Sequence, residues 1–297
     1  MTLLFGSGHR PLPQGHPDQV DLASLESNLL VSAGGTDSFE AKLRSFFRSA
    51  IDEVIDTART GRFFLSDLDK TEKTYLGTKF EILLRDWLDV PRGVILDLLI
   101  GGQEVDVKST TGGASGWMIP PEAIDQLCIL LRVNEQNATC AVGLARARRE
   151  YLRAGANRDA KTSFSAAGRQ NIWWLVQDYP YTPNFWTRIT SQQRAWIMEP
   201  RGGSERLARL FESCLEMPES RVLIASIAAQ DDFMKRIRRN GGARDFLAPK
   251  GIAILYSEID GAVIREIGLR CGKREFLSFS PQDARTADIL RNAGHID

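Results

Sequence analysis

The amino-acid sequence predicts an α/β protein made of two domains. The chain has 297 residues, which is enough for two ordinary domains. Two segments with helical spacing of apolar residues precede several β-rich segments. The segment 177–184 contains two prolines and is the best candidate for a boundary. We therefore expect a loose N-terminal arm over 1–37, a first domain over 38–178 and a second domain over 179–297.

The composition excludes several classes of protein. Lys and Arg total 38, as do Asp and Glu, so the net charge points to neither a nucleic-acid nor a membrane partner. No apolar run reaches the roughly 18–20 residues of a membrane span, and the start of the chain does not resemble a signal peptide. Four scattered cysteines favour a reducing cytoplasm over a structural zinc site. The three histidines lie near the chain ends, so we expect catalysis to use carboxylates and lysine.

Periodicity assigns elements along the chain. Apolar residues at helical spacing predict helices over 38–57 and 71–88. Strands are predicted for five β-rich segments: 94–100, 103–109, 128–133, 139–144 and 251–256. In the C-terminal part we expect an amphipathic helix at 204–215 and a short basic helix at 231–239. The apolar run 222–228 fits either a helix or a strand.

The predicted hairpin carries the residues best suited to catalysis. A two-residue turn at Gly101–Gly102 sets a register that places Asp97 opposite Asp106, about 5 Å apart on one face. Two like charges at that distance repel each other, which favours a cation between them. Lys108 points to the same face because it lies two residues beyond Asp106.

Glu81 joins this group from the second predicted helix, where it lies at the edge of the apolar stripe. Mg²⁺ is a hard ion held by a few carboxylates together with water and phosphate oxygens, so the three acids suit it. Such an ion lowers the pKa of a water and stabilises charge on a phosphate. The set therefore indicates a Mg²⁺-dependent nuclease. The alternative is a solvated strand face, because Asp-x-Lys triplets are common.

The acid followed by Asp-x-Lys resembles the active-site signature of restriction-endonuclease-like nucleases. More specifically, the chain resembles the NaeI restriction endonuclease family over roughly residues 50–255. Its catalytic Glu, Asp, Asp and Lys fall on Glu81, Asp97, Asp106 and Lys108, with Val107 in place of the family's cysteine. The segments that carry the resemblance are Lys70–Thr78, Val105–Ser109, Gly116–Glu122, Ala156–Lys161 and Gln230–Arg236, the last continued by Gly241–Arg244.

The resemblance implies a fold and an activity. The fold is a restriction-endonuclease-like core, a mixed central sheet flanked by helices, followed by a C-terminal α+β DNA-binding domain of the helix-turn-helix or winged-helix type. The activity is that of a type II restriction endonuclease of a restriction–modification system: Mg²⁺-dependent cleavage of duplex DNA at a short palindrome, leaving 5′-phosphate ends. The family also implies a second DNA copy as allosteric effector, and cutting both strands implies a homodimer. A non-cleaving DNA-binding regulator and a repair nickase remain as alternatives.

Basic residues provide the candidate DNA contacts. In the C-terminal part these are Lys235, Arg236, Arg238, Arg239 and Arg244, with three of them (Lys235, Arg238 and Arg239) at the spacing of one helical face. In the first domain they are Lys70, Lys73, Trp117, Asn157, Arg158 and Lys161. The alternative for the basic run is a solvated face, and for Trp117 it is a packed aromatic side chain.

Overall fold

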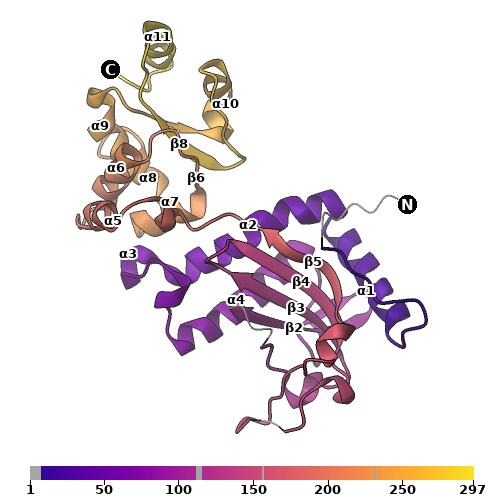
Figure 1. The fold of residues 1–297 in the computed structure, drawn as a ribbon. Helices are drawn as coiled ribbons and strands as arrows, with labels where there is room; N and C mark the ends of the chain where they lie inside the picture. Colours follow the sequence, from indigo (N-terminus) through magenta and orange to yellow (C-terminus); the bar gives the residue numbers. More distant parts are fainter. Residues whose placement is uncertain (1–7, 112–115, 156, 231) are drawn as a thin grey trace. The chain divides into compact units, whose positions relative to one another are not determined.

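The computed structural model describes residues 8–111, 116–155, 157–230 and 232–297. It divides the chain into two compact units (Figure 1): unit 1 is Met1–Val54 with Leu68–Asn184, and unit 2 is Ile55–Asp67 with Phe185–Asp297. The division falls after Asn184 instead of at 178/179, and unit 2 takes in Ile55–Asp67, which the sequence did not predict. The roles expected for the two domains stay predictions.

Unit 1 is built on a five-stranded mixed sheet, which confirms the predicted α/β class. The strands lie in the order of the sequence; β2 and β3 are parallel and the other neighbours are antiparallel. The second half of strand β5 overlaps the segment 177–184 that was predicted as a boundary, and both Tyr179 and Pro180 pair with β4. The strands are β1 (Leu98–Ile100), β2 (Gln103–Thr111), β3 (Leu127–Asn134), β4 (Thr139–Arg146) and β5 (Trp173–Pro180).

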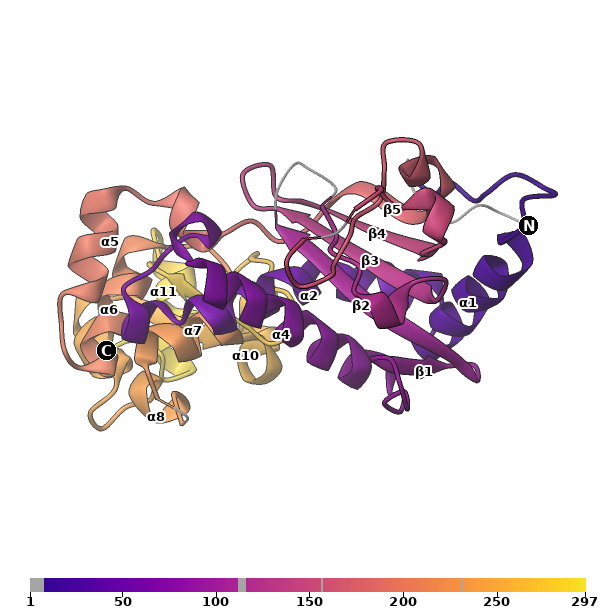
Figure 2. The same ribbon diagram turned by 90° about the horizontal axis from the view of Figure 1, so that it is seen from below.

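Helices α2 (Thr36–Ile55) and α4 (Lys70–Leu88) match the two predicted helices. Asp69 starts α4 with a capping box: its side chain accepts a hydrogen bond from the backbone of Glu72, whose carboxylate binds the backbone of Asp69 in return. Aromatic side chains join the two helices, with the ring of Phe47 5.3 Å from that of Phe80. Helix α4 lies alongside β2 (Figure 2), where Gly77 leaves room for the hydroxyl of Ser109.

The two faces of the sheet differ. Ser109 faces α4, so Asp106 and Lys108, at alternate positions of β2, lie on the other face. Their partners in the parallel ladder are Cys128 and Leu130 of β3. These two pack in a core with side chains from the irregular segments after β2 and β4, among them Trp117, Ile119, Leu152 and Phe164. Those segments therefore cover the sheet on the same face as Asp106.

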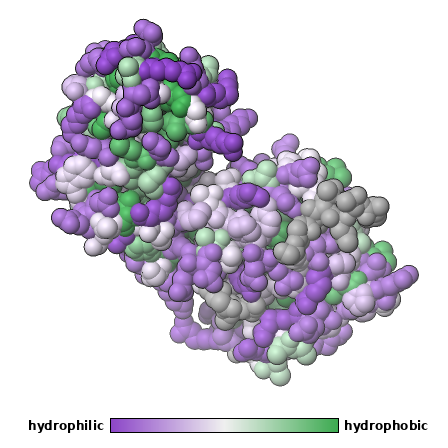
Figure 3. Space-filling model, turned by 45° about the horizontal axis from the view of Figure 1, so that its top comes forward, coloured by the Kyte–Doolittle hydropathy of each residue, from purple (hydrophilic) through white to green (hydrophobic). Residues whose placement is uncertain are grey.

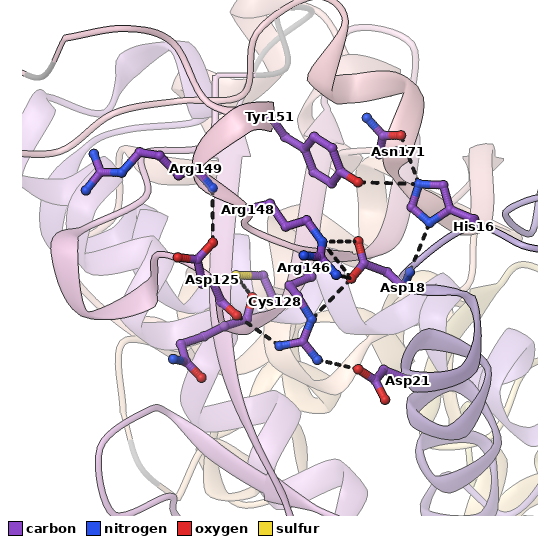
Figure 4. Close-up of polar contacts among 11 residues, drawn as sticks. His16, Asp18, Asp21, Asp125, Cys128, Arg146, Arg148, Arg149, Tyr151 and Asn171 are labelled. Carbon is purple, nitrogen blue, oxygen red and sulfur yellow. Dashed lines mark hydrogen bonds and ion pairs between the residues drawn. The ribbon is translucent and has the colours of Figure 1, made fainter.

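The expectation of a loose arm is wrong for residues 8–37, while residues 1–7 lie outside the described part. Helix α1 (Gln19–Ser32) buries Leu22, Leu25 and Leu29. Ahead of it, the carboxylate of Asp18 is 1% exposed and forms ion pairs with Arg146 at 3.2 Å and Arg148 at 2.7 Å (Figure 4). A buried carboxylate with two guanidinium partners fixes this segment to the end of β4.

Unit 2 combines helices with a three-stranded antiparallel sheet in the order β6-β8-β7. Its strands are β6 (Glu219–Ser220), β7 (Ala253–Tyr256) and β8 (Glu275–Phe279). Its helices are α3 (Thr57–Thr60), α5 (Ser191–Met198), α6 (Gly203–Ser213), α7 (Arg221–Ala228), α8 (Met234–Ile237), α9 (Ala243–Leu247), α10 (Ser257–Glu266) and α11 (Ala284–Asn292). The ambiguous run 222–228 is helical, and Ser220 caps it by accepting a hydrogen bond from Leu223.

The predicted basic helix is much shorter than expected. Helix α8 ends at Ile237, and Arg238 is extended. Asn240 and Gly241 have φ values of 69° and 98°, so the chain turns directly after the predicted helix range. The prediction that Lys235, Arg238 and Arg239 share one helical face is therefore wrong.

Hydrophilic residues cover most of the surface drawn in Figure 3, with hydrophobic residues in smaller areas between them. Within the described ranges, no helix is long and apolar enough to cross a membrane. The large apolar side chains that do lie exposed include Val20 and Val31 on α1, Val94 and Ile95 before β1, and Ile259 on α10.

Candidate active site

The hairpin has the register that the sequence predicts. Leu98 pairs with Val105, and Ile100 with Gln103. Gly101 and Gly102 form the turn with φ values of 57° and 80°, a combination that a two-residue hairpin turn requires and glycine adopts without strain.

Asp97 lies immediately outside this ladder. The paired residues of β1 begin at Leu98, so the next backbone positions of β2 lack a β1 partner. The Asp97 carboxylate takes that place: its Oδ2 accepts a hydrogen bond of 2.7 Å from the backbone N–H of Val107. Lys108 Nζ lies 3.7 Å from the same oxygen and 2.7 Å from Oδ1 of Asp106. The structure thus brings Asp97, Asp106 and Lys108 together at the point where β1 leaves β2.

Asp106 is the most deeply buried of the acids, with 3% of its surface exposed. Burial raises the pKa of Asp106 to about 6; the Lys108 ammonium opposes this shift, and the Asp97 carboxylate adds to it. Within the described residues, Oδ2 of Asp106 is buried and has no hydrogen-bond partner. A buried oxygen without a partner is costly unless a ligand or ion satisfies it.

Glu81 lies on α4 and is influenced by the charges of this group, but among the described residues no hydrogen bond or ion pair joins it to Asp97, Asp106 or Lys108. It is half-buried, and its pKa is raised by burial and by the charge of Asp97, while Lys108 opposes the shift. Burial alone would lower the pKa of Lys108, but the ion pair with Asp106 outweighs it and leaves that pKa above its usual value. Lys108 therefore stays charged between acids that repel each other.

The donor set fits Mg²⁺ chemically, because it offers carboxylate oxygens and one of them is buried without a partner. In the part of the chain that the structure describes, no three His, Cys, Asp or Glu side chains stand close enough together to form a metal cage. The two facts are compatible, since Mg²⁺ commonly takes only one or two protein carboxylates and completes its shell with water and phosphate oxygens.

Sequence reasoning missed Glu104, which lies on the same face of β2 as Asp106 and Lys108. Its carboxylate accepts hydrogen bonds from the backbone of Val94 at 2.6 Å and of Leu96 at 2.8 Å. The alternation Glu104-x-Asp106-x-Lys108 was the available signal, because it extends the charged face by one position.

The candidate DNA contacts of unit 1 fall into different settings. Lys70 and Lys73 lie at the start of α4. Oδ1 of Asn157 accepts hydrogen bonds from the backbone of Asp159 and Lys161, which closes a tight turn. This turn displays Arg158, whose side chain is 99% exposed.

The prediction that Trp117 contacts DNA is wrong. Trp117 is fully buried, and its indole N–H donates a 2.8 Å hydrogen bond to the carbonyl of Leu131. A side chain enclosed in this way cannot contact DNA. The segment 116–119 packs Trp117 and Ile119 inwards and leaves Met118 outside.

The basic residues of unit 2 also differ in their exposure and in their partners. Arg244 is half-buried and donates to the carbonyl of Ile254, and burial lowers its pKa, so it holds the fold together instead of facing solvent. Arg239 pairs with Asp297 at 3.2 Å, and Lys235 with Asp232 at 3.2 Å. Arg236 binds the side chain of Gln230. Arg238 is exposed and, as far as the chain is described, makes no side-chain contact of this kind.

Comparison with known proteins agrees with this geometry. The protein-family profile described as "Restriction endonuclease NaeI" matches residues 35–289. The chain is also 34% identical over 268 residues to the type II restriction enzyme NaeI of Lentzea aerocolonigenes, covering 87% of this chain and 82% of that protein.

The chain has a mixed sheet whose strand β2 carries an acid and a lysine in contact. Together with these comparisons, this defines a site-specific deoxyribonuclease of the type II restriction class. Within that class, the chain belongs to the NaeI restriction endonuclease family.

Proposed function

We propose that this enzyme cleaves both strands of duplex DNA at a short palindrome, with Mg²⁺ as cofactor, and leaves 5′-phosphate ends. Glu81, Asp97, Asp106 and Lys108 are the proposed catalytic residues. The observation that carries the proposal is the contact of Lys108 with both Asp106 and Asp97 beside a buried carboxylate oxygen that lacks a partner.

Each residue has a distinct task. Asp106 offers its free Oδ2, and Asp97 keeps its carboxylate in place through the Val107 N–H. Asp97 and Asp106 would hold Mg²⁺ directly and Glu81 would bind it through water; the ion would supply positive charge for the phosphate and lower the pKa of a water. Lys108 keeps its proton and lies where it can orient the attacking water or neutralise charge that develops on the phosphate.

A palindrome cut on both strands requires two active sites related by two-fold symmetry. Since the described residues of one chain contain one such group of acids, we propose a homodimer. The cytoplasm is the proposed location, in agreement with four cysteines that are all unpaired.

Unit 2 supports a second DNA site. Its elements α6, β6, α7 to α9, β7 and β8 follow the order of a winged helix, except that α10 lies between β7 and β8 where a winged helix has a hairpin turn. The sheet order β6-β8-β7 is also that of a winged helix. We propose that this unit binds a further copy of the recognition sequence and that the exposed Arg238 and Lys235 contact its phosphates.

Digestion of a plasmid of known sequence tests the proposal. With Mg²⁺ we expect linear products whose mapped ends share one short palindrome, and with EDTA no cutting. A repair nickase would give only open circles, and a regulator would bind the plasmid without cutting it.

A further inference from the structure

The loop between α4 and β1 displays two apolar side chains to solvent. Val94 is 92% exposed and its neighbour Ile95 is 76% exposed. Adjacent β-branched apolar residues at this exposure contribute nothing to the core of unit 1. Leu96, the next residue, is 5% exposed and anchors the loop.

This loop is held in a fixed shape. The carboxylate of Glu104 accepts hydrogen bonds from three successive backbone N–H groups, those of Val94, Ile95 and Leu96. At Gly93 an added Cβ would come within 2.4 Å of Glu104 Oε2 and 2.6 Å of the Leu96 carbonyl, so the backbone passes too closely for a side chain. The exposure of Val94 and Ile95 is therefore built into the fold.

The loop also stands on the catalytic face. Glu104, which holds it, precedes Asp106 by two residues of β2, a spacing of about 7 Å on one face of a strand. Along the chain, Ile95 is two residues from Asp97, which limits their Cα separation to about 7 Å. A phosphate bound by Asp97 and Asp106 would leave the adjoining groove of the duplex within reach of this loop.

We propose that Val94 and Ile95 are an apolar contact with the minor groove of the bound DNA, pressed against sugars and base edges next to the cleaved phosphate. This inference rests on the proposed function, which puts DNA at Asp97 and Asp106. Apolar side chains that enter the minor groove commonly wedge against a base step and help to bend the duplex. A second copy of the chain is a poorer occupant, because two side chains bury far less than the roughly 1,200 Å² of a stable protein interface.

The test compares the wild type with Val94→Ser/Ile95→Ser on a duplex that carries the mapped site. Both positions are exposed, so we expect the variant to have the same melting temperature as the wild type. We expect binding without Mg²⁺ to weaken about ten-fold or more, and single-turnover cleavage to slow in parallel. The fluorescence of a 2-aminopurine placed beside the cleaved phosphate should increase when the wild type binds, and it should increase less when the variant binds. Val94→Ile/Ile95→Val should behave as the wild type.

Val20→Ser/Val31→Ser on α1 is the matched control, since it removes two apolar side chains elsewhere in unit 1 that are 75% and 76% exposed. Wild-type binding and cleavage by the loop variant would overturn the inference. So would a loop variant that sediments as a smaller species than the wild type without DNA, because the pair would then join protein subunits. Failure of the proposed function itself is separate: the wild type would not cut the plasmid.

Discussion

The carboxylate of Asp97 accepts a 2.7 Å hydrogen bond from the backbone N–H of Val107, the residue between Asp106 and Lys108. This bond replaces the ladder contact that β1 no longer supplies at that position. It holds an acid from the end of the loop in register with the acid and lysine of β2. The arrangement of the site therefore depends on one backbone donor as well as on charge.

Replacement of Asp97 should separate these two roles. Asp97→Asn keeps an oxygen for the Val107 N–H but removes a charge that repels Asp106, so we expect the metal-free variant to melt no lower than the wild type. Asp97→Ala loses the acceptor and should be less stable than Asp97→Asn by about 1 kcal/mol. Both variants should lose Mg²⁺-dependent cleavage. Thermal melts in EDTA and plasmid digestion measure these effects; a lower melting temperature for Asp97→Asn would contradict the proposed repulsion.

Lys108→Ala should reduce the cleavage rate at least about 100-fold, because it removes the only ammonium that contacts both Asp97 and Asp106 among the described residues. DNA binding should stay within several-fold, since the loss concerns the transition state. Single-turnover kinetics and a binding titration separate the two quantities. Lys42→Ala, at an exposed position of α2, is the control. Near-normal cutting by Lys108→Ala would remove this lysine from the mechanism.

The pKa of Asp106 predicts how the stability of the metal-free enzyme depends on pH. Burial raises this pKa from 3.8 to about 6 in the folded protein. The folded state thus binds the proton more tightly than the unfolded state, and this group lowers stability as pH rises from about 4 to about 6. Asp106→Asn should remove that part of the pH dependence. Denaturant unfolding in EDTA at several pH values checks it; an unchanged slope in the variant would show that Asp106 is not the group responsible.

The sequence was sufficient for the hairpin because local rules determine it. The Gly101–Gly102 turn sets the register, and strand alternation then places Asp106 and Lys108 on one face. The sequence could not reveal that Asp97 leaves the ladder and binds the Val107 N–H, since this depends on where the loop enters the sheet.

Predictions that needed tertiary contacts failed. Helix α1 lies between Gly- and Pro-rich turns, and the buried Asp18 that fixes the start of this helix finds its arginines about 130 residues away. The basic run 231–239 has helical spacing, yet the helix ends at Ile237 because Arg238 is already extended. The spacing of the charges alone did not predict this change in backbone conformation.

Trp117→Ala should affect stability far more than DNA recognition. The indole is fully buried and bonded to Leu131, so its removal should cost about 3–5 kcal/mol of unfolding free energy. Met118→Ala, at the exposed neighbouring position, should cost less than about 0.5 kcal/mol. Chemical denaturation compares the two. A stable Trp117→Ala with impaired DNA binding would restore the original assignment of this residue to the DNA interface.

The last prediction concerns the proposed effector site of unit 2. Arg238→Ala/Arg239→Ala should leave the catalytic group of unit 1 intact but weaken the second DNA, and each lost phosphate contact should reduce the salt dependence by about one unit of log–log slope. Arg238 should contribute most, because Arg239 is already paired with Asp297. Arg285→Ala, which removes an exposed arginine of α11, is the control. If binding at this site is coupled to catalysis, a short duplex with the recognition sequence should speed cutting of a single-site plasmid by the wild type and by this control, but not by the double variant. Equal stimulation of all three proteins would place the effector site elsewhere, and no stimulation of the wild type would leave a dimer without an effector site.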